Sequence, residues 1–83
     1  MVKMKVMVKL YATLRRFAPQ GTDIGDEFEV IFQGTTIGEL VHHLGFPLDQ
    51  AKIVMVNGQR VTKMDFTLSD DDLIVIFPPV GGG

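Results

Sequence analysis

The sequence contains no cysteine. It therefore offers no disulfide bond, no zinc thiolate and no thiol nucleophile. It also lacks any apolar run that approaches the ~20 residues of a membrane-spanning helix, and no signal peptide opens it. Together these absences predict a cytoplasmic protein that has no membrane partner.

Basic residues are too few for a surface that binds nucleic acid. The chain has 8 lysines and arginines against 10 aspartates and glutamates, with a formal net charge of −2 and an isoelectric point near 5.5. Domains that bind nucleic acid usually carry a basic excess. The apolar fraction of 46% is instead typical of a folded protein. The 83 residues predict one domain over 1–83, near the lower limit for a self-sufficient core.

The first half of the chain predicts two strands. Apolar residues alternate with lysines at the start, which is the period of a half-buried strand. The residues expected to face the core there are Val2, Met4, Val6, Val8 and Leu10. Met7 is expected to be exposed, and residues 12–18 are expected to form a helical turn. A second strand is predicted from Asp26 to Phe32, with Phe28, Val30 and Phe32 inward.

A helix is predicted to begin after Thr36. This threonine and Glu39 have the spacing of a capping box, in which each side chain bonds the backbone N–H of the other residue. Gly45 stands where a glycine that ends a helix belongs. Between them lies an apolar stripe at helical spacing, formed by Ile37, Leu40, Val41 and Leu44.

The second half of the chain predicts three more strands. Segments 53–56 and 59–62 flank Asn57-Gly58, a dipeptide that favours the type I′ hairpin turn because both positions need positive φ. An acidic turn over 69–72 precedes a last strand over 73–77. The order β-β-α-β-β-β predicts an α+β fold, a mixed sheet packed on one short helix.

The chain ends in two prolines, Val80 and three glycines, Gly81, Gly82 and Gly83. Pro78 cannot donate to a sheet, and Pro78-Pro79 favours a stiff, extended exit. We therefore expect a globular body over 1–77 and a projecting tail over 78–83. Glycines would let the backbone pass through a narrow channel. The terminal carboxylate of Gly83 would then be the tail's only functional group.

The stretches KVMVKLYATLRRFA, IVMVNGQRV and DLIVIFPPVGGG resemble the ubiquitin-like sulfur carriers of the MoaD/ThiS family. The resemblance covers nearly the whole chain and implies a β-grasp fold with an extended C-terminal diglycine tail. The FPPV segment and the LRRFA turn are most similar to the small subunit of molybdopterin synthase. The VGGG ending and the short helix are similar to thiamine-pathway carriers. Asp70-Asp71-Asp72 departs from the Gly-Asp turn of many relatives.

The resemblance also implies a chemistry for the tail. An E1-like adenylating enzyme would use ATP to adenylate Gly83, which would then be converted to a thiocarboxylate. As the small subunit of molybdopterin synthase, in a heterotetramer with the large subunit, the protein would donate this sulfur to the dithiolene of molybdopterin. It would be no enzyme alone and would hold no permanent cofactor. Two alternatives stay open: a thiamine-pathway sulfur carrier, and a ubiquitin-like modifier conjugated through Gly83.

The last strand predicts a docking surface. It is apolar at every position, so both of its faces need cover, and one helix covers only one of them. With Ile74 and Ile76 turned to the helix, Val75 and Phe77 emerge on the open face, where Met55 joins them. An apolar patch beside the tail is typical of a partner interface. The alternative is an ordinary scattered surface.

Three polar features are interpreted as ordinary surface, and no metal site is expected. Adjacent helical residues such as His42 and His43 point about 100° apart and make a poor pair of metal ligands. The acidic run 70–72 is interpreted as a turn rather than a cation site. Arg15 and Arg16 are interpreted as a solvated patch that a partner could touch.

Overall fold

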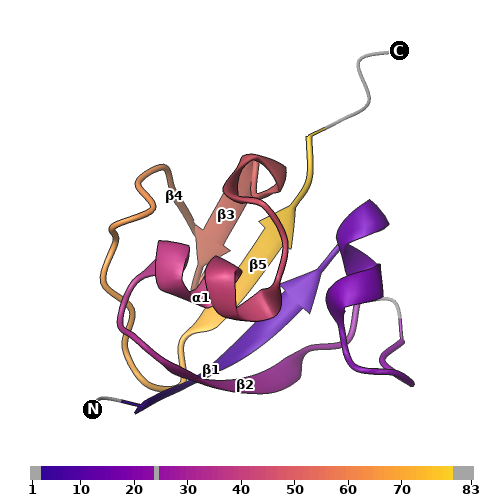
Figure 1. The fold of residues 1–83 in the computed structure, drawn as a ribbon, viewed down its shortest axis with the longest axis horizontal. Coiled ribbons are helices and arrows are strands. Elements are labelled where there is room, and N and C mark those ends of the chain that lie inside the picture. The colour runs from indigo at the N-terminus through magenta and orange to yellow at the C-terminus, as the bar shows by residue number, and fades with distance from the viewer. Residues whose placement is uncertain (1–2, 24, 80–83) are drawn as a thin grey trace.

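The computed structural model describes residues 3–23 and 25–79. Their five strands form one sheet in the order β2-β1-β5-β3-β4. Helix α1 (Ile37–Leu44) crosses one face of this sheet, as Figure 1 shows. The strands are β1 (Lys3–Leu10), β2 (Phe28–Gln33), β3 (Ile53–Val56), β4 (Gln59–Val61) and β5 (Leu73–Phe77). The predicted element order and the α+β class are confirmed.

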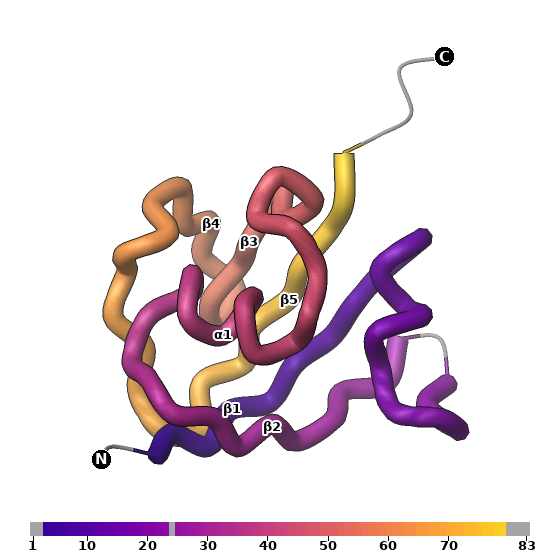
Figure 2. The backbone as a smooth tube through the Cα atoms, in the orientation of Figure 1, coloured from indigo at the N-terminus to yellow at the C-terminus, as the bar shows by residue number. Residues whose placement is uncertain are grey.

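The two central strands fix where the chain leaves the sheet. Strands β1 and β5 are parallel, with Lys9 opposite Val75, whereas the other three pairings are antiparallel. Parallel neighbours end at the same edge of a sheet, and Figure 2 shows the two strands running in one direction. The end of β1, the following 3-10 helix η1 (Ala12–Phe17) and the end of β5 therefore meet at one edge.

The core lies between the sheet and α1. Alternate residues of the central strands are fully buried there, as the sequence predicts: Val6, Val8, Ile74 and Ile76 are all 0% exposed. Complete burial of such a side chain stabilises the fold by about 1.5–3 kcal/mol. Residues outside the strands and the helix close the ends of this core, among them Leu14, Phe46 and Leu68. The short α1 depends on this packing, because two turns of helix are unstable alone.

Local hydrogen bonds set both ends of α1. The Thr36 hydroxyl accepts from the Glu39 backbone N–H at 3.2 Å, and the Glu39 carboxylate accepts from the Thr36 N–H at 3.1 Å and the Thr35 N–H at 2.9 Å. These hydrogen bonds, that from the Thr35 backbone above all, lower the pKa of Glu39. At the other end Gly45 has φ 97°, a left-handed conformation that suits glycine. The predicted capping box and helix end are confirmed.

Several predicted boundaries are wrong by one or two residues. Strand β2 begins at Phe28 rather than Asp26, because the Asp26 N–H bonds the Asp23 carbonyl in a turn, and it ends one residue later than expected. Strand β4 ends at Val61 rather than Thr62. Met7 is half-buried rather than exposed. Val2, expected to face the core, lies outside the described residues.

Candidate functional site

The residues predicted to form the docking surface lie together on the face of the sheet opposite α1. Val75, Phe77 and Met55 are half-buried there, whereas Ile74 and Ile76 point into the core. The register places Met55 opposite Val75 across β3 and β5. The predicted direction of each side chain is confirmed. The role of these residues as an interface stays a prediction. We call this side of the sheet the open face.

Sequence reasoning missed Tyr11 as a partner of Phe77. The two rings stack with centroids 4.8 Å apart and an interplanar angle of 12°. The Tyr11 N–H donates to the Ile76 carbonyl at 3.3 Å, which draws the end of β1 to β5. Tyr11 follows the lysine side of the alternation in β1, and a parallel pairing of β1 with β5 would have pointed to this contact. The aromatic surface beside the end of β5 is thus a pair of rings.

The chain turns sharply just after Tyr11. Ala12 has φ 54°, in the left-handed region that costs a residue with a side chain roughly 1–2 kcal/mol. This turn starts η1, whose Leu14 is buried in the core. The strained residue therefore lies between the ring that stacks on Phe77 and the helix that closes this edge of the core.

The end of β5 is held by a backbone hydrogen bond as well as by the stack of Phe77 on Tyr11. The Phe77 carbonyl accepts from the Lys52 N–H at 3.0 Å. Pro78 is buried and Pro79 is exposed. The first residue of the predicted tail therefore packs on the body. Val80, Gly81, Gly82 and Gly83 lie outside the described residues, so their predicted role in the tail stays a prediction.

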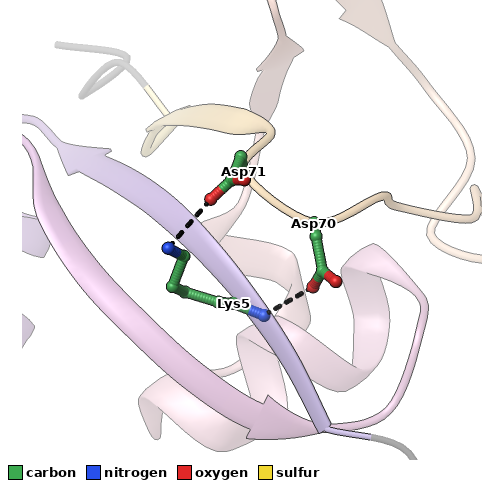
Figure 3. Close-up of polar contacts among 3 residues, drawn as sticks. All are labelled: Lys5, Asp70 and Asp71. Carbon is green, nitrogen blue, oxygen red and sulfur yellow. Dashed lines mark hydrogen bonds and ion pairs between the residues drawn. The ribbon is translucent and has the colours of Figure 1, made fainter.

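The acidic turn links distant parts of the sheet (Figure 3). The Lys5 N–H donates to the Asp70 carboxylate at 3.0 Å, and the Lys5 ammonium lies 3.1 Å from the Asp71 carboxylate, which raises the pKa of Lys5. Asp72 accepts from the Asn57 side chain at 2.8 Å and from the Ser69 N–H at 2.8 Å. These carboxylates are thus used in structural contacts, and the interpretation as a turn is confirmed.

The remaining polar candidates lie apart from the open face. His42 and His43 are exposed on α1, and the described residues contain no group of three or more histidines, aspartates and glutamates that could hold a metal ion. The two histidines border a hollow of about 580 Å³ between α1 and the outer strand β2. Arg16 is exposed, but Arg15 is half-buried and donates to the Thr22 carbonyl at 3.1 Å. Arg15 therefore secures the segment after η1 instead of being fully solvated.

Comparison with known proteins identifies related chains. The ThiS family matches residues 8–83. No curated protein matches the sequence significantly. Among the helices of the described residues, none is long and apolar enough to cross a membrane.

Solved structures share the fold. Small archaeal modifier protein 1 from Haloferax volcanii is 25% identical over 95% of this chain and 99% of its own, with a TM-score of 0.62. A candidate molybdopterin converting factor subunit 1 from Pyrococcus furiosus is 29% identical over 93% of this chain and 99% of its own, also with a TM-score of 0.62. A third structure is the complex of subunits 1 and 2 of the molybdopterin converting factor from Helicobacter pylori. Its matching chain is 20% identical over 96% of this chain and 100% of its own, with a TM-score of 0.58.

Proposed function

The chain belongs to the ThiS family of ubiquitin-like proteins, and on that premise we propose that it is a sulfur carrier that serves as the small subunit of molybdopterin synthase. The observation that carries the sulfur-carrier part of the proposal is the extent of the family match, which runs from Val8 through all three final glycines. A similar chain from Pyrococcus furiosus, 29% identical, is described as a converting factor subunit 1 and supports the same pathway.

The proposed chemistry takes place on the carboxylate of Gly83. In an activating enzyme, a carboxylate oxygen attacks the α-phosphorus of ATP, and pyrophosphate leaves. Hydrosulfide from the sulfur donor then attacks the carbonyl carbon of the acyl-adenylate, AMP leaves, and loss of the S–H proton gives a thiocarboxylate. In the large subunit the thiocarboxylate sulfur displaces an oxygen substituent of the molybdopterin precursor, and water then cleaves the resulting thioester, which leaves the sulfur on the precursor and restores the Gly83 carboxylate.

The body's contribution is to aim the tail. The end of β5 is held through the Tyr11 stack, the Lys52 N–H and the buried Pro78. Three contacts thus hold the point of the body from which the proposed tail begins. A partner that binds the open face would therefore receive the glycines in a defined register. We propose the large synthase subunit and an E1-like adenylating enzyme as such partners. The paired subunits of the Helicobacter pylori structure support the first of these.

A second candidate is a protein modifier joined to lysines through Gly83. Its support is the similarity to small archaeal modifier protein 1, which is 25% identical over nearly the full length of both chains. A third, the thiamine-pathway carrier, shares the same activated glycine. The three candidates differ in the acceptor. A molybdopterin precursor or a thiamine precursor would accept the sulfur held at Gly83, whereas a protein amine would accept the Gly83 acyl group itself.

The proposal is tested by intact-mass measurement after incubation with an activating enzyme, ATP and a sulfur donor. We expect the mass to rise by one oxygen-to-sulfur exchange, located by fragmentation in the C-terminal peptide. Adding the large subunit and the precursor should return the original mass and yield molybdopterin. Sulfur located elsewhere, or no exchange where a known carrier reacts, would contradict the proposal. Conjugates of higher mass instead would favour the modifier.

A size series at Gly82 tests whether the tail must be thin. Gly82→Ile should block activation or transfer, because a branched side chain would not fit a channel shaped for glycine. Gly82→Ala is the graded control and should retain part of the activity. The melting temperature should stay unchanged in both variants. Full transfer by Gly82→Ile would show that no narrow channel exists, and a large fall in its melting temperature would show that the tail belongs to the fold.

A further inference from the structure

One row of the open face crosses four strands and has a cation at each end. Lys9 pairs with Val75, Val75 with Met55, and Met55 with Arg60. Directly opposite residues in neighbouring strands project from the same face of a sheet. The row therefore reads cation, apolar, apolar, cation across β1, β5, β3 and β4. Its centre consists of two residues of the predicted docking surface.

The charges of the open face differ from those of the protein as a whole. Among strand residues the register places four cations on this face, namely Lys3, Lys5, Lys9 and Arg60, and one anion, Glu29; Asp71 of the turn before β5 adds a second anion beside Lys5. The whole chain has a net charge of −2, so its other surfaces carry the acidic excess. Lys5 is engaged with Asp71, and this is the only ion pair within the described part of the chain. Lys9 and Arg60 thus form no ion pair there.

We infer that the open face docks on a partner protein whose apolar patch is flanked by two carboxylate clusters. The inference rests on the proposed function and adds the chemistry of the partner's surface. Three strand spacings separate the backbones of Lys9 and Arg60, which is roughly 14 Å. The two carboxylate clusters should lie a similar distance apart, and the flexible side chains of Lys9 and Arg60 can shorten or lengthen it. The apolar patch between them meets Val75 and Met55, and the stacked rings of Tyr11 and Phe77 lie beside it.

The arrangement favours a protein over a nucleic acid as the occupant. A phosphate backbone is bound by an extended basic surface, whereas here the cations flank an apolar centre that also includes Ile53, opposite Phe77. An apolar core with a charged rim is the usual anatomy of a protein interface. Rim charges mainly accelerate association and fix the register. Register matters to a carrier, because a shift of one strand would displace the tail from its channel.

Charge reversal tests the inference, with the large synthase subunit as the binding probe. The variants are Lys9→Glu and Arg60→Glu, and the control is Lys63→Glu, an exposed lysine outside the row that changes the net charge by the same amount. At about 0.05 M salt we expect each row variant to bind about tenfold more weakly, mainly through slower association, and the control to stay within about twofold. At about 0.5 M salt the difference should shrink, because screening is stronger.

Phe77→Ala in the same series separates the inference from the proposed function. Weaker binding of Phe77→Ala, with both row variants equal to the control, would overturn the inference and leave the function standing. Unchanged binding of every variant, Phe77→Ala included, would show that the large subunit does not dock on this face and would count against both. Tighter binding of Lys9→Glu would indicate a basic rim and overturn the inference.

Two further readouts identify the occupant directly. A carbodiimide, which takes up the water lost as the bond forms, should join the Lys9 amine to a carboxylate of the large subunit by an amide bond. The absence of any such cross-link at Lys9, with the complex formed, would contradict a carboxylate neighbour. Single-stranded DNA is the second probe. Binding of DNA by the wild-type protein that is lost in Lys9→Glu would show a nucleic-acid surface and overturn the protein partner.

Discussion

The two faces of β5 share one strand and one kind of residue but have different environments. Ile74 and Ile76 are completely buried against α1, whereas Val75 and Phe77 are only half-buried on the open face. The buried pair is surrounded by other apolar side chains. On the open face Val75 lies in a row that has a cation at each end, and Phe77 stacks on Tyr11. An apolar strand can thus supply the core with alternate residues and a binding surface with the others.

This difference in burial predicts that substitutions at neighbouring residues of β5 affect different properties of the protein. A substitution on the covered face should lower the free energy of unfolding. It should weaken binding only because a smaller fraction of the protein is folded. A substitution on the open face should act on affinity first. The sheet pleat alone separates these effects, because successive side chains point to opposite faces.

The largest expected effect is that of Ile76→Ala. Deleting a fully buried isoleucine costs about 2–5 kcal/mol through lost burial and the cavity that remains. A domain of this size has only about 5 kcal/mol of stability, so the variant should be close to unfolding. Denaturation in urea measures the loss, and Val75→Ala is the matched control, expected to lose clearly less. Equal losses in the two variants would show that the faces do not differ.

A smaller and opposite effect is expected for Ala12→Gly. Glycine adopts positive φ without steric cost, so the variant relieves the strain at φ 54°. We expect a gain of up to about 1 kcal/mol, less than the strain itself because glycine is more flexible in the unfolded chain. In a domain of this size that is a rise of about 4–8 °C in melting temperature. A lower melting temperature would show that Ala12 is not strained.

The smallest expected effect concerns pH and the cap of α1. The pKa of Glu39 is lowered in the folded state, so its carboxylate stabilises the protein fully above its ordinary pKa of 4.5. That contribution is lost as the pH falls through the lowered value. Wild type should therefore be more stable than Glu39→Gln near pH 6, and the difference should fade as the pH is lowered below 4.5. Because the cap lies away from the open face, affinity for the large subunit should not change at pH 6.

The elements were predictable where local chemistry decides them. The capping box, the Asn57-Gly58 turn and the alternation in β1 each depend on residues close in sequence, and each is confirmed. The direction of Val75 and Phe77 followed from the period of a strand. The start of β2 was misplaced because a backbone bond at Asp26, invisible in the residue types, holds a turn there.

The rest depends on pairing between distant segments. The Tyr11–Phe77 stack and the row from Lys9 to Arg60 require β1 beside β5 and β3 beside β4 in one register. Alternation places a residue on a face but does not say which strand is its neighbour. The half-buried Arg15 is similar, since its bond to the Thr22 carbonyl depends on the path of the chain after η1.

The central claim is that β5 folds with one face and binds with the other, and Phe77→Ala tests it most directly. Calorimetric titration with the large subunit should show at least about 2 kcal/mol of lost affinity, about thirtyfold. Urea denaturation of the free variant should show a stability loss below the 3–5 kcal/mol that is typical of a core phenylalanine. Unchanged affinity together with a loss in that core range would contradict the claim.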